Sequence, residues 1–103
     1  MVTKAKLQVL AALTEAEWQE WVENLATLRD WKHYHTHNSR RSDEGFPDLV
    51  LARGSKLIVA ELKKEGGKVS EAQREWLQAF ALTGVDAYTW WPHDIEEVEE
   101  VLR

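Results

Sequence analysis

The stretch GFPDLVLARGSKLIVAELK, residues 45–63, decides the fold of this chain. It holds two short apolar runs joined by a turn at Gly54-Ser55. Gly-Ser suits a tight hairpin turn, so the stretch predicts two antiparallel strands. With the turn centred on this dipeptide, the pairing register places Asp48 directly opposite Glu61 on one face of the sheet.

Two carboxylates that face each other across a hairpin repel and destabilise the sheet unless something compensates. Lys63 lies two residues beyond Glu61, so the period of two in a strand puts its ammonium on the same face. A divalent cation between Asp48 and Glu61 would neutralise the pair, and oxygen ligands of this kind suit Mg²⁺ or Mn²⁺. The alternative is that these residues are ordinary charged strand ends that reach solvent. The apolar runs on both sides favour acids that emerge from a buried sheet.

Three short segments together resemble a known nuclease family. Gly45-Phe46-Pro47-Asp48-Leu49, Glu61-Leu62-Lys63 and Gln73-x-x-Trp76-Leu77 are similar to the VRR-NUC branch of the PD-(D/E)xK nuclease superfamily, especially its small stand-alone phage members. The resemblance runs from about Thr14 to Leu102. It implies an α/β fold with a restriction-endonuclease-like αβββαβ core, in which helices flank a central mixed sheet and a further helix closes the chain. We therefore expect one domain over residues 1–103, with residues 1–12 as an N-terminal extension.

The same resemblance implies a metal-dependent DNA endonuclease. Asp48, Glu61 and a backbone carbonyl near Leu62 would hold Mg²⁺ or Mn²⁺, and Lys63 would act on the attacking water or on the phosphate. The implied substrate is DNA, including branched or junction DNA, in replication, repair or recombination. The implied assembly is a homodimer. The alternative is a non-catalytic module on a nuclease fold that binds nucleic acid or protein.

Helical and strand patterns on both sides of the hairpin supply the rest of the core. Thr14 and Glu17 form a capping box that opens a helix to about Arg29, and a second box opens a helix at Ser70 that reaches about Leu82. Strands are expected over residues 31–36 and 85–91, because apolar and polar residues alternate there. A last amphipathic helix follows Asp94.

Two residues on these helices are further site candidates by resemblance. Glu15, at the edge of the apolar stripe that runs from Trp18 to Leu28 on the first helix, would reach towards the metal; the alternative is a solvated acid that the positive helix N-terminus favours. Gln73 would border the metal and orient a ligand, a water or the substrate. Its alternative is a side chain that only completes the second capping box.

Polar side chains near the hairpin are candidates for other contacts. His33, His35 and His37 share one face of a strand and suggest zinc only weakly, because ligands along a straight strand lie too far apart. Ser39, Arg40 and Arg41 would form a loop beside the site, with hydroxyl and guanidinium groups for phosphates. The residues expected to contact DNA are these three together with Lys64 and Lys68.

Composition limits the class of protein. The chain has 103 residues, no cysteine and a net charge of -5. No cysteine means no thiolate catalysis and no cysteine zinc site. Between Lys32 and Lys68, eight basic and five acidic residues leave a balance of +3, whereas the remainder carries -8. Such polarity can steer an anionic substrate. Without a membrane-length apolar run or a signal peptide, we expect a cytoplasmic protein. The resemblance to phage members of the family implies that a phage or prophage encodes it.

Overall fold

The computed structural model describes residues 3–37 and 43–103 of the chain. The elements in order are α1 (Lys4–Ala11), α2 (Glu15–Leu28), β1 (Lys32–His35), β2 (Leu49–Arg53), β3 (Lys56–Leu62), α3 (Glu71–Leu82), β4 (Asp86–Trp90), the short 3₁₀ helix η1 (Pro92–Asp94) and α4 (Ile95–Leu102). From α2 onward this order confirms the predicted core and its closing helix. The sequence did not predict α1, which lies in the segment expected to be an N-terminal extension.

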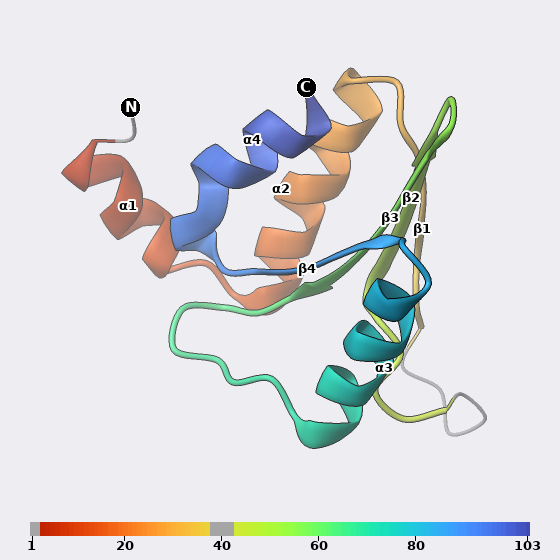
Figure 1. Ribbon diagram of the computed structural model, residues 1–103. Coiled ribbons are helices and arrows are strands. Elements are labelled where there is room, and N and C mark those ends of the chain that lie inside the picture. The colour runs from red at the N-terminus through yellow and green to blue at the C-terminus, as the bar shows by residue number, and fades with distance from the viewer. Residues whose placement is uncertain (1–2, 38–42) are drawn as a thin grey trace.

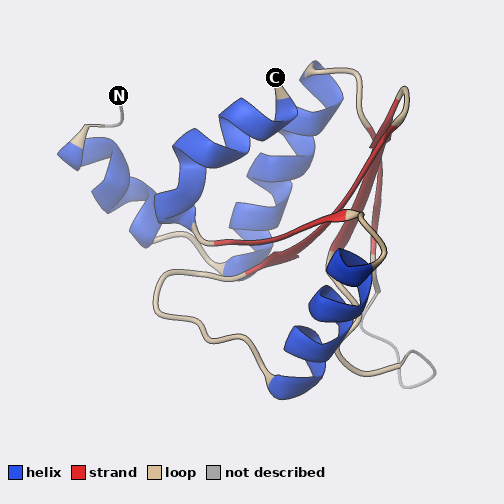
Figure 2. Ribbon diagram, viewed as in Figure 1, coloured by secondary structure: helices blue, strands red, loops and turns tan. Residues whose placement is uncertain are grey.

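The four strands form one mixed sheet in the order β1-β2-β3-β4 (Figure 2). The pairs β1–β2 and β2–β3 are antiparallel, and β3–β4 is parallel. A parallel pair needs a crossover connection, and α3 supplies it. Figure 1 shows α2 and α4 packed together on one side of the sheet and α3 on the other side. Among the described helices, none combines the length and the apolar character that a membrane crossing needs.

The hairpin turn has the geometry that its sequence predicts. Gly54 adopts φ +60°, the backbone conformation that a type II′ turn requires at its first central position. The register pairs Leu49 with Ala60 and Val50 with Val59. Continued by one residue, it brings Asp48 opposite Glu61, as the sequence predicted.

The two faces of the sheet contact different helices. Leu49, Leu51 and Ile58 belong to the main core, which they form together with Trp18, Val22 and Ala26 of α2 and Ile95, Val98 and Leu102 of α4. Because side chains alternate along a strand, Val59 and Glu61 point to the α3 side. From Ile58 to Leu62, β3 is therefore buried on both faces, and Glu61 is enclosed.

The structure confirms two of the features predicted near helix ends and differs from the prediction at two others. Both predicted capping boxes are formed, at Thr14 and at Ser70. Leu28, expected in the core stripe of α2, is 78% exposed because the helix ends there. Asp94 stands at the N-cap of α4, but its side chain accepts a hydrogen bond from the backbone N–H of Trp91 at 3.0 Å, so it stabilises η1 instead of capping α4.

Candidate active site

The segment before β2 passes unusually close to the start of α3. Gly45 has φ +89°, and a Cβ placed there would lie 2.5 Å from the backbone carbon of Ala72. Only glycine combines that conformation with that approach. The next residue, Phe46, packs edge-on against Trp76 and Phe80, with ring centroids 5.0 and 5.8 Å away. These contacts fix the segment that carries Asp48 against α3.

Backbone hydrogen bonds hold Asp48 in place on both sides. Thr36, just after β1, donates from its hydroxyl to the carbonyl of Pro47 at 2.7 Å and from its N–H to the carbonyl of Asp48 at 2.8 Å. The carboxylate of Asp48 accepts a hydrogen bond of 2.7 Å from the backbone N–H of Leu62. The contact of Leu62 with the acid pair is thus made by its N–H; a metal contact of its carbonyl stays a prediction.

Glu61 is the one charged or polar side chain among the buried residues that the structure describes, with 2% of its surface exposed. Its Oε2 accepts a hydrogen bond from Nε2 of Gln73 at 2.9 Å, and Nζ of Lys63 lies 3.7 Å from the same oxygen. Burial, reinforced by a hydrogen bond with Asp48 and by the Asp48 charge, raises the pKa of Glu61 to about 9. Without a cation, the acid pair therefore holds a proton at neutral pH.

The other carboxylate oxygen of Glu61, Oε1, is buried and has no hydrogen-bond partner among the described residues. A buried polar atom is rarely left unsatisfied, so this atom suits an external ligand. Nowhere in residues 3–37 and 43–103 do three His, Asp or Glu side chains gather closely enough to hold a metal by themselves. Two carboxylates still fit Mg²⁺, which commonly binds through one or two carboxylates and completes its coordination with water and phosphate.

Gln73 satisfies both interpretations that the sequence left open. Its Oε1 accepts from the backbone N–H of Ser70 at 2.8 Å and completes the capping box, while its Nε2 donates to Glu61. One amide therefore joins the start of α3 to the buried acid of β3. The geometry places Gln73 at the site without testing the role it plays there.

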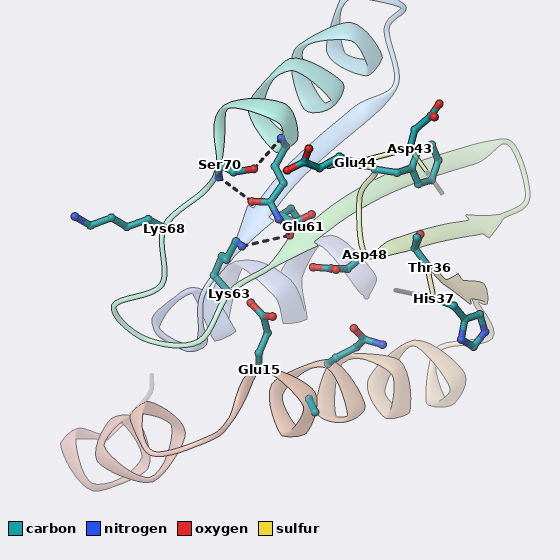
Figure 3. A pocket seen from close by; sticks show the side chains of 15 residues that line it. Glu15, Thr36, His37, Asp43, Glu44, Asp48, Glu61, Lys63, Lys68 and Ser70 are labelled. Carbon is teal, nitrogen blue, oxygen red and sulfur yellow. Dashed lines mark hydrogen bonds and ion pairs between the residues drawn. The ribbon is translucent and has the colours of Figure 1, made fainter. Parts of the chain in front are cut away.

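Glu15 stands at the edge of the same cavity. It is the first residue of α2 and lies below Asp48 and Lys63 in Figure 3, with its carboxylate directed towards them. Its negative charge adds to the raised pKa of Glu61. Unlike Glu61, it is exposed to solvent.

A cleft of about 700 Å³ brings these residues together. Its lining includes all five of the predicted catalytic residues: Glu15, Asp48, Glu61, Lys63 and Gln73. A smaller cavity of about 380 Å³ adjoins it at Lys63 and is also lined by Lys64 and Lys68. Ser39, Arg40 and Arg41, predicted to contact DNA, lie outside the described residues.

The histidines of β1 do not form the weak zinc site considered from the sequence. His33 contacts α2 instead, with Nδ1 3.2 Å from Glu23 and Nε2 2.9 Å from the hydroxyl of Thr27. The rings of His35 and His37 lie 4.3 Å apart, but no group of three possible ligands forms in the described part of the chain. The zinc interpretation was therefore wrong.

Three polar residues of the cleft had escaped the sequence argument: Thr36, Asp43 and Glu44. Thr36 reaches the site because β1 pairs with β2 in a register that places it beside Asp48. The long connection between these strands leaves that register undetermined by turn chemistry, so no local signal in the sequence reveals it. In Figure 3, Asp43 and Glu44 lie on the side of the cleft opposite Glu15.

Comparison with known proteins agrees with this geometry. The VRR-NUC domain matches residues 3–90, most of the chain. The chain belongs to the VRR-NUC domain family. A solved structure described as a VRR_NUC domain protein superposes with a TM-score of 0.70 and 26% identity, covering 88% of this chain and 86% of the other. A second, described as a VRR_NUC domain, has a TM-score of 0.70 at 19% identity, with 88% and 96% covered, and shows the shared fold.

Curated relatives point to the same class. Over 52 residues the VRR-NUC chain is 46% identical to a Fanconi-associated nuclease 1 homolog of Caenorhabditis briggsae and 42% identical to that of Caenorhabditis elegans. These matches cover 48% of this chain but only 6% of each relative. Together with the family match they support a nuclease.

Proposed function

We propose that this VRR-NUC domain is a metal-dependent endonuclease that hydrolyses phosphodiester bonds of DNA. The observation that carries the proposal is the pairing of Asp48 with the buried Glu61. The two acids meet at the cleft, next to the ammonium of Lys63, with a raised pKa on Glu61 and with one of its carboxylate oxygens unpartnered among the described residues. An ion pair between Glu61 and Lys63 has no need of a second acid, whereas a cation site does.

Asp48 and Glu61, with the carbonyl of Leu62, are the groups that would hold Mg²⁺ or Mn²⁺. The chemistry that such a cation supplies is a more acidic water and a counter-charge for the phosphate. Gln73 holds one oxygen of Glu61 through a neutral amide, which orients the carboxylate and leaves its negative charge available. The backbone N–H of Leu62 does the same for Asp48. The protein thus orients its acids before any ligand arrives.

Lys63 is placed to act on the reacting groups. Its ammonium lies on the acid pair's face of β3, and its separation of 3.7 Å from Glu61 is an ion pair without a hydrogen bond. The ammonium therefore keeps its donors for a water or a phosphate oxygen. In either role, it stabilises negative charge that develops during hydrolysis.

The strand of DNA would lie along the basic side of the cleft. Lys64 and Lys68 line the adjoining cavity next to Lys63, where they can neutralise phosphates on either side of the cleaved bond. In Figure 3 the side chain of Lys68 extends away from the acids, as expected for a contact with a neighbouring phosphate. The curated relatives are named as Fanconi-associated nuclease homologs, which supports nuclease activity, and the resemblance seen in the sequence supports a role on branched DNA in repair.

The test is cleavage of duplex, flap, splayed and four-way DNA by the purified chain with Mg²⁺, with Mn²⁺ or with a chelator. Lys63→Ala should abolish cleavage while DNA binding stays within about twofold, since one of several cationic contacts is lost. Lys56→Ala, at the far end of the same strand, is the matched control and should cut normally. Absence of metal-dependent cleavage by the unmodified chain, with DNA binding retained, would refute the proposal in favour of a binding module.

A further inference from the structure

The connection between β3 and α3 is tied to the end of β4 right behind Lys63. The backbone N–H of Lys63 donates to the carbonyl of Trp90 at 3.0 Å. The next residue, Trp91, donates its indole N–H to the carbonyl of Gly67 at 2.8 Å. Two consecutive residues, Trp90 at the end of β4 and Trp91 just after it, therefore hold the backbone of Lys63 and the turn that follows it.

Gly67 lies directly against the side chain of Lys63. A Cβ placed on Gly67 would be 3.4 Å from Cβ and 3.6 Å from Cδ of Lys63, and 3.0 Å from the carbonyl oxygen of Lys64. The backbone of Gly67 thus covers the aliphatic part of Lys63, whose side chain is only 14% exposed. Covered in this way, the side chain has little room to swing into solvent, and its ammonium stays beside Glu61.

A second tie strengthens the first. Both the backbone N–H and Nδ1 of His93 contact Oε1 of Glu65, at 3.0 and 2.7 Å. The imidazole of His93 also stacks on Trp91, with ring centroids 5.7 Å apart and planes within 8°. His93 therefore holds the turn at Glu65, and Trp91, whose ring stacks on that of His93, holds it at Gly67.

We propose that Trp91 is a positioning residue for Lys63. It holds Gly67 over the lysine side chain and so keeps the ammonium in the cleft, where the proposed nuclease reaction needs it. This inference rests on the proposed function for its kinetic consequence but not for its structural one. Trp91 itself is not among the residues that line the cleft; it acts through Gly67.

The first test uses Trp91→Phe, which keeps an aromatic ring on His93 and removes the indole N–H. At saturating DNA we expect the rate of cleavage to fall about tenfold or more, with DNA affinity within about twofold, because only the transition-state contact of Lys63 is disturbed. An unchanged rate of cleavage, or a loss confined to DNA affinity, would refute the inference. Trp21→Phe, at a half-buried tryptophan of α2, controls for the loss of an indole.

The second test needs no activity. Acetylation of the metal-free protein with acetic anhydride, followed by mass spectrometry of the peptides, reports how accessible each lysine is. In Trp91→Phe we expect Lys63 to react several-fold faster relative to the exposed Lys56, and Trp21→Phe should leave that ratio unchanged. An unchanged ratio in Trp91→Phe overturns the inference even if the protein cuts DNA. A raised ratio in a chain that does not cut DNA supports the inference and refutes only the proposed function.

A substitution at the second tie guards against a Trp91 variant that does not fold. Glu65→Ala removes the oxygen that both nitrogens of His93 contact, while leaving the indole contact with Gly67 in place. It should raise the acetylation of Lys63 in the same direction and by less. No change in that variant would show that the turn does not govern Lys63, and the inference would fail on that result.

Discussion

Replacing Glu61 by glutamine should stabilise the metal-free protein. The structure encloses this acid and raises its pKa to about 9, whereas the unfolded chain leaves it near its ordinary value of 4.5. Between these two values the folded state holds a proton that the unfolded state has released. Stability from this proton is complete below about pH 4.5 and is lost as the pH rises through the folded pKa.

The size of the effect follows from the proton that must be retained. At about pH 7.5, three pH units above the ordinary pKa, holding the proton costs the fold up to about 4 kcal/mol. Glutamine is neutral in both states and avoids this cost. Its amide can accept from Gln73 through its oxygen and donate to Asp48, so the hydrogen bonds at the site survive. We expect a gain of about 2–4 kcal/mol, or roughly 10 °C or more in melting temperature for a domain of this size.

The assay is thermal and urea unfolding with a chelator, from about pH 5 to 9, for the natural chain, Glu61→Gln and the exposed control Glu20→Gln. The gain of Glu61→Gln should shrink towards pH 5 and grow with pH, and the control should show neither trend. Adding Mg²⁺ at a hundred times its Kd should shrink the gain by about 2.7 kcal/mol, because the bound ligand stabilises the natural chain and the variant lacks the negative charge that binds it. A Glu61→Gln chain that is less stable than the natural one at high pH without metal would refute the reasoning.

Three further outcomes follow from other contacts. Gly45→Ala should destabilise the fold by about 2 kcal/mol or more in urea unfolding, because it combines a left-handed backbone with a clash against Ala72. Arg53→Ala should cost about 1–3 kcal/mol in the same assay, since the guanidinium donates to the carbonyls of Arg29 and Arg103 and lies 4.4 Å over the ring of Trp31; Arg53→Lys should recover little of it. The homodimer expected from the resemblance is tested by sedimentation velocity, where Tyr34→Lys should yield monomers because Tyr34 is 59% exposed on the sheet; a natural chain that is already monomeric would contradict this expectation.

How far the sequence predicted the molecule depends on how local each signal is. The hairpin was predictable because Gly54 fixes its turn and the period of two then fixes every pair up to Asp48 and Glu61. The capping boxes at Thr14 and Ser70 were predictable for the same reason, since four consecutive residues contain the whole signal. Both are short-range patterns that tertiary packing has no cause to override.

What the sequence could not predict depends on long-range contacts. The position of Thr36 beside Asp48 follows from strand pairing across a long connection, which no turn residue determines. The contact of Trp91 with Gly67 joins residues 24 positions apart through a parallel strand and a turn without regular structure. Even the burial of Glu61, which raises the pKa of this acid, follows from where α3 lies and not from the residues next to it in the chain.

The choice of partners around the acid pair explains why the pair can be stable and still open to a ligand. A lysine hydrogen-bonded to Glu61 would satisfy the buried carboxylate and compete with an entering cation. Here the hydrogen bonds to the two acids come from neutral donors, the amide of Gln73 and the backbone N–H of Leu62, while the ammonium of Lys63 stays at 3.7 Å. Neutral donors orient a carboxylate without cancelling its charge, and in the metal-free protein the charge is cancelled by a proton instead. A proton, unlike a side chain, leaves when a cation arrives, so metal uptake at neutral pH should release close to one proton for each site filled.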